Sequence, residues 1–424
     1  MACQSVCLRR LARGARDGIV GFGRFLANRR VTTAALIAGW SKATSQACAG
    51  RHILAIQDTS EITFKTKTDR RRGLGEIGKG GGRGVLLHAM LAIDATNGWL
   101  LGLVGGRIWS RKGRVKIHHN KRPLRRKESE RWVTTAEQAR RVLAQAAMIT
   151  VMGDRESDLY AAWARVPSET THLLVRAMKD RTTAGGGKLS TAELMCGGQA
   201  SVPLRDRVGR PARTAVLRLR WGQVTLNKPR YLKEKGLAGQ VTLSLVEVVE
   251  IDAPKGAKSL VWRLLTTHPV DSPQKAWQVV TWYRQRWTIE QFFRTLKQQG
   301  LQLEDSQLET ADRLIKLTAV AARAAAIIMQ LVQGRDGSSG AQASIVFTPE
   351  QIQTLHALVP KLEGRTQLQK NPHPPQSLAW AAWVIGKLGG WDGYPRSKPP
   401  GPITFRHGLQ QFLAIAQGWA LRDV

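Results

Sequence analysis

Two apolar stretches that each lead into an aspartate constrain the fold of this chain most. Residues 52–57 are mostly apolar and end at Asp58, and residues 148–152 are followed by Gly153 and Asp154. Short apolar runs of this kind predict buried β-strands. An acid at the carboxyl end of a strand projects from the edge of a sheet, where the functional sites of open α/β sheets gather. The two aspartates therefore predict a site at one sheet edge.

The order of the remaining patterns predicts how the sheet is assembled. Further strands are expected at 86–93, 99–109, 172–177 and 260–266, and long helices at 128–147 and 273–299. From about 185 to 260 apolar and polar residues alternate, which indicates a mostly antiparallel β insertion. We therefore predict an α/β protein with an RNase H-like mixed sheet, flanking helices, and this insertion before the last catalytic helix. Residues 1–50 and 331–424 are expected to be helical, which leaves 51–330 as the central domain.

Net charge is the property of the composition that bears most on function. The chain has 65 Lys and Arg against 31 Asp and Glu, a formal net charge of +34. Such a charge favours a polyanionic partner, and nucleic acid is the commonest, because each phosphate that is neutralised releases a condensed counterion. A ribosomal protein and a membrane-surface binder are the alternatives. The stretch 111–131 holds ten Lys or Arg and is interpreted as a DNA-backbone strip or a solvated loop.

The cysteines and the apolar segments bear on the compartment. Cys3, Cys7, Cys48 and Cys196 form neither a CxxC pair nor a disulfide framework suited to a chain of 424 residues, so free thiols are expected. No secretory signal is evident, and we find no stretch approaching the ~18 apolar residues of a membrane span. The sequence therefore predicts an intracellular protein without a membrane partner.

The helix expected at 273–299 presents one acid among cations and aromatic residues. At about 100° per residue, one face carries Tyr283, Arg286, Trp287, Glu290, Arg294 and Lys297. The neighbouring face, with Trp282, Ile289, Phe293 and Leu296, is expected to pack on the core. Taken alone, the first face is ordinarily a solvated one with ion pairs such as Glu290–Arg294. The two aspartates predicted at the sheet edge favour a functional role for the carboxylate of Glu290.

Carboxylates from two strands and one helix can converge on metal ions. Mg²⁺ is bound by few carboxylates together with phosphate oxygens of a substrate. Two such ions about 4 Å apart can activate a water or a 3′-hydroxyl and stabilise the leaving oxygen at phosphorus. We therefore expect Asp58, Asp154 and Glu290 to hold two Mg²⁺ ions, for which Mn²⁺ would substitute.

The same helix carries a family signature. Tyr283, Arg286, Glu290 and Lys297 are separated by two, three and six residues, and this pattern resembles the YREK signature of the insertion-sequence-four family of bacterial cut-and-paste transposases. The segments 56–60 and 153–158 resemble the two aspartate segments of that family. Lys127-Glu128-Ser129 with Trp132, and Leu388-Gly389-Gly390-Trp391, are similar to further family landmarks.

The resemblance implies a function for each part of the chain. It implies a transposase of the Asp-Asp-Glu type that cuts double-stranded DNA at transposon ends through a hairpin and joins the ends to target DNA. Residues 1–50 would be a DNA-binding arm, 51–330 the catalytic domain, and 331–424 a region for dimerisation in a synaptic complex. The protein would be cytoplasmic, at the bacterial nucleoid.

The resemblance also implies roles for residues beside the acidic triad. Trp262 and Trp287 would handle a flipped base, at a stacking energy of about 1–3 kcal/mol per base that offsets the cost of flipping. By the same resemblance the hairpin phosphate is held by Arg176, Tyr283 and Arg286. Arg294 and Lys297 would contact the backbone at the transposon end. Each tryptophan has the alternative of packing in the core.

Two other functions remain open from the sequence. The stretch before Asp58 is short for a full end-recognition domain, so specific end binding could be lost while the catalytic core is intact. The chain would then be an inactive DNA-binding or dimerising relic that inhibits transposition. A structure-specific nuclease with the same core is the third interpretation. It would cleave DNA without transposon ends and would not join the products.

Overall fold

The computed structural model describes residues 6, 8–12, 14–64, 73–78, 82–111, 113, 122–204, 212–256, 259–394 and 396–420. The chain divides into two compact units. The core unit, as we call it, comprises Gly50–Asp58 and Val115–Trp287, and the helical unit comprises Met1–Ala49, Thr59–Arg114 and Thr288–Val424. The predicted division at residues 50 and 330 stays a prediction.

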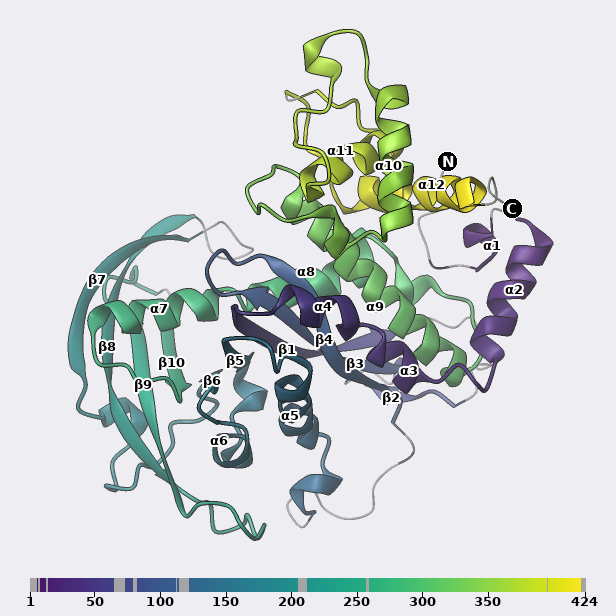
Figure 1. Ribbon diagram of the computed structural model, residues 1–424. Helices are drawn as coiled ribbons and strands as arrows, with labels where there is room; N and C mark the ends of the chain where they lie inside the picture. The colour runs from purple at the N-terminus through teal and green to yellow at the C-terminus, as the bar shows by residue number, and fades with distance from the viewer. Residues whose placement is uncertain are drawn as a thin grey trace. The chain divides into compact units, whose positions relative to one another are not determined.

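A mixed sheet of ten strands organises the fold, and the predicted α/β class is confirmed (Figure 1). The strand order is β2-β3-β1-β5-β6-β10-β9-β8-β7, and β4 pairs with β3. The strands are β1 (His52–Thr63), β2 (Gly75–Ile77), β3 (Gly82–Asp94), β4 (Leu100–Trp109), β5 (Met148–Gly153), β6 (Thr171–Arg176), β7 (Met195–Leu204), β8 (Arg213–Asn227), β9 (Gln240–Glu250) and β10 (Val261–Thr266). Flanking helices and helical terminal regions complete this architecture, which is consistent with the predicted RNase H-like fold.

In the core unit, a parallel part and an antiparallel part of the sheet meet at β6. β5 is parallel to both β1 and β6, while β10 is antiparallel to β6 and to β9. The parallel pair β5–β6 is joined through α6 (Tyr160–Arg165), as parallel strands require a crossover. β7, β8 and β9 form the predicted insertion, paired antiparallel throughout. Residues 205–211, in the connection between β7 and β8, lie outside the described residues.

The described part of the core unit has two further helices. α5 (Glu130–Val142) precedes β5 and is shorter than the predicted helix at 128–147. α7 (Pro273–Arg284) follows β10, with Ser272 as its N-cap and Pro273 in its first turn, where a proline costs no hydrogen bond. Ala276, Val279, Val280 and Tyr283 are its buried residues. The spacing of three and four places them on one face of the helix.

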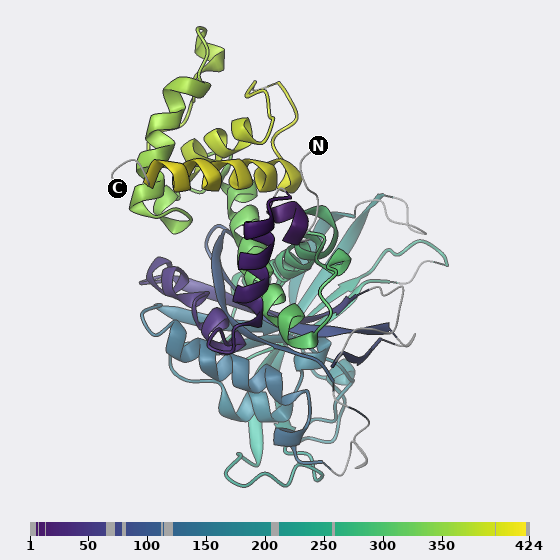
Figure 2. The same cartoon turned by 90° about the vertical axis from the view of Figure 1, so that its right-hand side faces the viewer.

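The helical unit is built around α9 (Ala311–Gly334). Its other helices are α1 (Leu8–Leu11), α2 (Arg16–Ala27), α3 (Thr33–Ala38), α4 (Ser41–Ala47), α8 (Trp287–Arg294), α10 (Pro349–Leu362), α11 (Leu378–Leu388) and α12 (Pro402–Ala420). Figure 2 shows the purple N-terminal helices beside the green α9, and both α2 and α3 contact it. The predicted helical character of residues 1–50 and 331–424 is therefore confirmed for the parts that are described.

The helix α9 corrects one expectation from the sequence. It is the one helix in the described part of the chain that is long and apolar enough to cross a membrane, and 67% of its apolar window is buried inside the protein. Trp40 Nε1 donates to Ala319 O at 3.0 Å, and Gln330 Nε2 donates to Leu101 O at 2.9 Å. Contacts of this kind identify α9 as the packed central helix of its unit. The sequence does not show α9 as an uninterrupted apolar run, because the helix contains Lys316 and Arg323.

Candidate active site

Asp58 and Asp154 follow the paired part of two neighbouring parallel strands. The last pair of that register is Ile56 of β1 opposite Met152 of β5, and each aspartate comes two residues later in the chain. β5 ends at Gly153, just before Asp154, but β1 runs on to Thr63, so the prediction that its strand ends at Asp58 is wrong. Because neighbouring strands lie about 4.8 Å apart, the two aspartates are near each other where the parallel pairing of β1 and β5 ends, in the core unit.

An arginine in the turn between α7 and α8 holds the first of these carboxylates. Arg286 Nη1 donates to Asp58 Oδ2 at 3.2 Å, and the two side chains are 12% and 15% exposed. The Arg286 guanidinium also lies over the Trp287 ring, 5.1 Å from its centroid. Partial burial strengthens this ion pair relative to an exposed one. Asp58 and Trp287 are therefore linked through one guanidinium.

The second carboxylate caps a short helix. Asp154 Oδ1 accepts from the backbone N–H of Glu156 at 2.8 Å, at the start of the 3₁₀ turn Arg155–Ser157. Ser157 Oγ donates to the carbonyl of Asp154 at 2.7 Å. A Cβ on Gly153 would come within 2.3 Å of that Ser157 oxygen. The glycine before Asp154 is thus required by the close turn that fixes the aspartate.

Glu156 and Arg131 are partners rather than site residues. Arg131 Nη2 donates to Glu156 Oε2 at 3.0 Å, and burial lowers the pKa of Arg131. The Arg131 side chain is only 8% exposed, so including it in the DNA-backbone strip at 111–131 was wrong. It belongs to the buried face of α5, which the sequence pattern did not separate from the basic run before it. Residues 112 and 114–121 of that strip lie outside the described residues.

Three of the predicted DNA-contacting residues gather in the core unit beside the aspartates. The Trp262 ring meets the Tyr283 ring edge-on, with 5.6 Å between the centroids. Arg176, at the end of β6, donates from Nη2 to Val261 O at 2.9 Å. Burial lowers the pKa of Arg176, and the charge of Arg155 lowers it further. Trp262, Tyr283 and Arg176 therefore stand together where β6 ends and β10 begins.

Tyr283 is set up as a neutral hydroxyl donor. Its side chain is only 5% exposed. Burial raises its pKa to about 12, against the smaller opposing influence of Arg286 and Arg176. A phenol with such a pKa keeps its proton at neutral pH and can donate a hydrogen bond to a phosphate oxygen.

The predicted continuous helix 273–299 is wrong, and the break falls among the signature residues. α7 ends at Arg284, α8 begins at Trp287, and Thr295–Gln299 form a π-helix. At the break, Gln285 N–H bonds to Trp282 O and Arg286 N–H bonds to Tyr283 O, a tighter spacing than that of an α-helix. The tight turn changes the helical phase, so Tyr283 is buried while Trp287 is 45% exposed.

The remaining predicted site residues belong to the helical unit. Glu290 lies in the first turn of α8, exposed, and Arg294 is exposed at the end of the same helix. Lys297 lies in the π-helix, with its Nζ 4.0 Å from Glu304 Oε1. Among the described residues no three His, Cys, Asp or Glu side chains form a metal-binding group. That Glu290 completes a triad with Asp58 and Asp154 stays a prediction.

The donor set at the sheet edge suits a hard cation. Asp58 and Asp154 offer carboxylate oxygens, and no His or Cys is part of the pair. Mg²⁺ prefers one or two carboxylates and takes its remaining ligands from water and substrate phosphates. The carboxylate pair therefore fits a divalent metal of the kind typical of enzymes that act on nucleic acid phosphates.

Comparison with known proteins agrees with this chemistry. Residues 116–327, half of the chain, match the family model of the transposase DDE domain. The cryo-EM structure of a piggyBac transposase synaptic complex with hairpin DNA is similar at a TM-score of 0.36 and 11% identity, covering 69% of this chain. The alignment spans 49%, about half, of that transposase chain. By the match to its family model, this chain belongs to the transposase DDE domain family, whose chemistry is the phosphoryl transfer of DNA transposition.

Proposed function

We propose that the protein is an active cut-and-paste transposase whose chemistry is carried by Asp58, Asp154 and Glu290. The observation that supports this most is the parallel register of β1 and β5, whose last pair, Ile56 and Met152, is followed two residues later by Asp58 and by Asp154. Arg286, Tyr283 and Arg176 stand beside them in the same unit. Glu290 lies one helical turn after Trp287, whose ring stacks on the guanidinium that holds Asp58.

Divalent metal ions fit the proposed site. Two Mg²⁺ or Mn²⁺ ions, bound by the carboxylates and by DNA phosphate oxygens, would supply activation of the attacking oxygen and stabilisation of the leaving one. Asp58, Asp154 and Glu290 would hold them. Binding of a cation at Asp58 would compete with Arg286, because both use the same carboxylate. The Arg286 guanidinium would then be available to a DNA phosphate.

The groups around the aspartates suit a distorted DNA end. Tyr283 donates a neutral hydroxyl, and Arg176 and Arg286 supply charge-assisted hydrogen bonds of the kind that phosphates accept. Trp287 is exposed and can stack on a flipped base. Trp262 stands against Tyr283 and can support the same base. Arg294 and Lys297 would contact the DNA backbone. Cleavage through a hairpin, strand transfer into target DNA, and a dimeric synapse belong to this proposal.

The insertion-sequence-four assignment belongs to the proposal too. It is supported by the unbroken spacing of Tyr283, Arg286, Glu290 and Lys297. By this assignment the protein would be bacterial and would act in the cytoplasm, at the nucleoid.

A cleavage assay with a matched acid variant tests the proposal. End-labelled duplexes taken from the DNA on both sides of the gene would be incubated with Mg²⁺ and wild-type protein, Glu290→Gln or Glu304→Gln. Both glutamates lie in the helical unit, and Glu304 bonds to Thr63 N–H. We expect strand cleavage and hairpin products with wild type and Glu304→Gln, and at least a ~10³-fold slower reaction with Glu290→Gln, since metal ligation accounts for several kcal/mol of the barrier.

The inactive relic is the second candidate. Binding of these duplexes with no metal-dependent cleavage by wild-type protein would support the relic and contradict the proposal. Cleavage of duplexes without the flanking DNA at an equal rate, and without joining, would point to a nuclease instead.

A further inference from the structure

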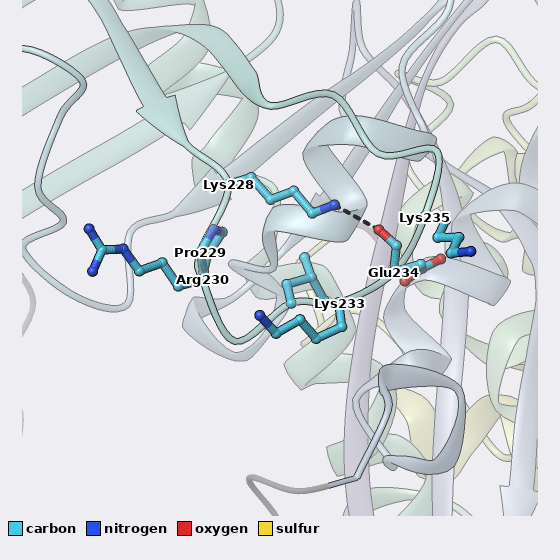
Figure 3. A pocket seen from close by; sticks show the side chains of 7 residues that line it. Lys228, Pro229, Arg230, Lys233, Glu234 and Lys235 are labelled. Atoms are coloured by element: carbon cyan, nitrogen blue, oxygen red, sulfur yellow. Dashed lines mark hydrogen bonds between the residues drawn. The ribbon is translucent and has the colours of Figure 1, made fainter.

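The loop between β8 and β9 is a basic segment of the described core unit outside the site. Residues 228–235 contain Lys228, Arg230, Lys233 and Lys235 with one acid, Glu234. They line an open hollow of about 340 Å³ (Figure 3). No residue of this loop takes part in the site at the carboxyl edge of β1 and β5.

The backbone of the loop presents its side chains to solvent. Leu232 N–H bonds to Pro229 O at 2.9 Å, which closes a turn with Arg230 and Tyr231 at its corner. Tyr231 is 72% exposed, so its ring and hydroxyl are accessible to a partner. Arg230 extends away from the loop in Figure 3, and Lys233 and Lys235 are also exposed.

The loop is held in one conformation by its own contacts. Lys228 Nζ crosses the loop to the carbonyl of Glu234 at 2.7 Å, as Figure 3 shows. Lys228 N–H bonds to Gly239 O, and the Tyr160 hydroxyl donates to Ala238 O at 2.8 Å. A binding segment held in this way loses less conformational entropy when it meets its partner.

Arg165 ties the loop to the helices behind it. Its guanidinium contacts Glu234 at 3.4 Å, Glu130 at 3.1 Å and Glu137 at 2.9 Å. The side chain is 25% exposed, and its hydrogen bonds to Glu137 and Glu130 help to raise its pKa. Without Arg165 the three carboxylates would repel one another. The carboxylate of Glu234 thus pairs with Arg165 and not with the cations of the loop.

The same network brings a second basic segment to the loop. α5 begins at Glu130, and the chain just before it carries the exposed Arg125 and Arg126 in the 3₁₀ turn Leu124–Arg126. Because Arg165 bonds to both Glu130 and Glu234, it joins the start of α5 to the loop. The described core unit therefore carries a basic surface made of Arg230, Lys233 and Lys235, with Tyr231 exposed beside them, and Arg165 ties this surface to the helix that follows Arg125 and Arg126.

We propose that this surface, called here the 230 surface, binds the phosphate backbone of double-stranded DNA as a contact separate from the active site. Cations that are exposed yet held on a fixed backbone suit a repeating polyanion, and an exposed tyrosine can donate to a phosphate or lie against a sugar. The inference rests on the proposed function only in taking DNA as the polyanion. We expect the contact to be independent of sequence, because exposed cations on an open surface meet the phosphates of the backbone rather than base edges inside a groove.

The salt dependence of DNA binding tests the 230 surface. The triple variant Arg230→Gln, Lys233→Gln, Lys235→Gln would be compared with wild type and with a matched control, Lys179→Gln, Arg218→Gln, Lys255→Gln. The control also removes one Arg and two Lys that are exposed in the core unit. Each lost phosphate contact lowers the slope of log K against log salt by about 0.9, so the triple variant should lose about 2 to 3. The control should keep the wild-type slope.

Two results would overturn the inference. One is a wild-type slope for the triple variant, and the other is an equal loss of slope for the control. Failure of the proposed function would look different: wild-type protein would not cleave, while its salt slope could still be compared with that of the variants.

Glu234→Gln tests the role of Arg165 in holding the loop. This change makes the loop more positive, so charge alone predicts tighter DNA binding. If the ion pair between Arg165 and Glu234 positions the loop, the variant will bind DNA more weakly than wild type despite the added positive charge. Tighter binding by Glu234→Gln would contradict the positioning role.

Discussion

The two ends of the parallel strands β1, β5 and β6 carry opposite chemistry. Towards the carboxyl ends lie Asp58, Asp154 and Arg176, whose side chains are partly exposed. At the amino ends lie His52, at the start of β1, and His172, at the second residue of β6. One end thus carries acidic and basic side chains that reach solvent, while the other gathers imidazole rings into a packed cluster.

The histidine cluster is held by one hydroxyl and by ring contacts. Thr150 Oγ1 of β5 lies 2.7 Å from His52 Nε2 and 2.7 Å from His268 Nε2. His172 stacks on His268 with centroids 3.9 Å apart. Trp282 of α7 meets His52 edge-on at 4.8 Å. Burial, together with smaller effects of the neighbouring His172 and His52, lowers the pKa of His268 to about 3.

Consecutive residues of α7 serve the two ends. Trp282 packs on the histidine cluster, and Tyr283 packs against Trp262 beside the aspartates. The histidine cluster at the amino ends therefore anchors α7, and the next residues of that helix lie beside the aspartates. Activity should depend on groups at the carboxyl ends, and stability on groups at the amino ends.

The largest expected effect comes from a substitution that changes only the carboxyl end of the parallel strands. Asp154→Asn should slow cleavage at least ~10³-fold, because a metal ligand accounts for several kcal/mol of transition-state stabilisation. Its cost in stability should be about 1 kcal/mol, the usual value of a helix cap. The matched control, Glu156→Gln two residues on, loses only a pair whose carboxylate is 63% exposed. Cleavage rates and urea unfolding would be measured for both, and equal activities would contradict the assignment.

A pair of tryptophan variants separates the two ends next. Trp282→Ala should lower the free energy of unfolding by about 2–3 kcal/mol, somewhat less than for a fully buried tryptophan, since its side chain is half buried. Trp287→Ala, whose ring is 45% exposed, should cost less than about 1 kcal/mol and reduce cleavage instead. Denaturant unfolding and single-turnover cleavage supply the two readouts. The comparison fails if Trp287→Ala destabilises the protein more than Trp282→Ala.

The smallest effect concerns pH. His268 is neutral in the folded protein, with a pKa of about 3, and its unfolded pKa is about 6.5. Between those values the unfolded state binds more protons, so stability is complete above the unfolded pKa and falls as the pH is lowered through this window. The loss is at most about 1.4 kcal/mol per pH unit. Unfolding free energies at about pH 7.5, 6.5 and 5.5 should fall less steeply for His268→Gln than for wild type. Identical slopes would show that His268 does not titrate on unfolding.

The sequence could predict most of the strands and that Asp58 and Asp154 come after two apolar runs, because each depends on local sequence. That the two strands pair in parallel, and that β1 runs on to Thr63, came only from the structure. The break between α7 and α8 was not predictable, since its tight turn at Gln285 and Arg286 contains no proline or glycine. That Arg131 is buried depends on a partner 25 residues away, Glu156. Periodicity within one element does not carry such information.

The histidine cluster and the 230 surface were missed for different reasons. His52, His172 and His268 are far apart in the chain, and the pairing of β1, β5, β6 and β10 brings them together, with His268 two residues after the end of β10. The signal of the 230 surface was local: several cations around Tyr231 between two alternating strands. It was assigned to the β insertion because the alternating pattern identifies strands and does not describe the loop that joins them.

Gly153 has a consequence for how this sequence can drift. Even an alanine at this position would place its Cβ 2.3 Å from Ser157 Oγ and 2.6 Å from Ser157 Cβ. Substitutions at 153 and 157 are therefore coupled: a side chain at 153 becomes tolerable only after residue 157 has lost its own. Among functional descendants of this gene, the two positions should change together and in that order, with glycine passing from one to the other.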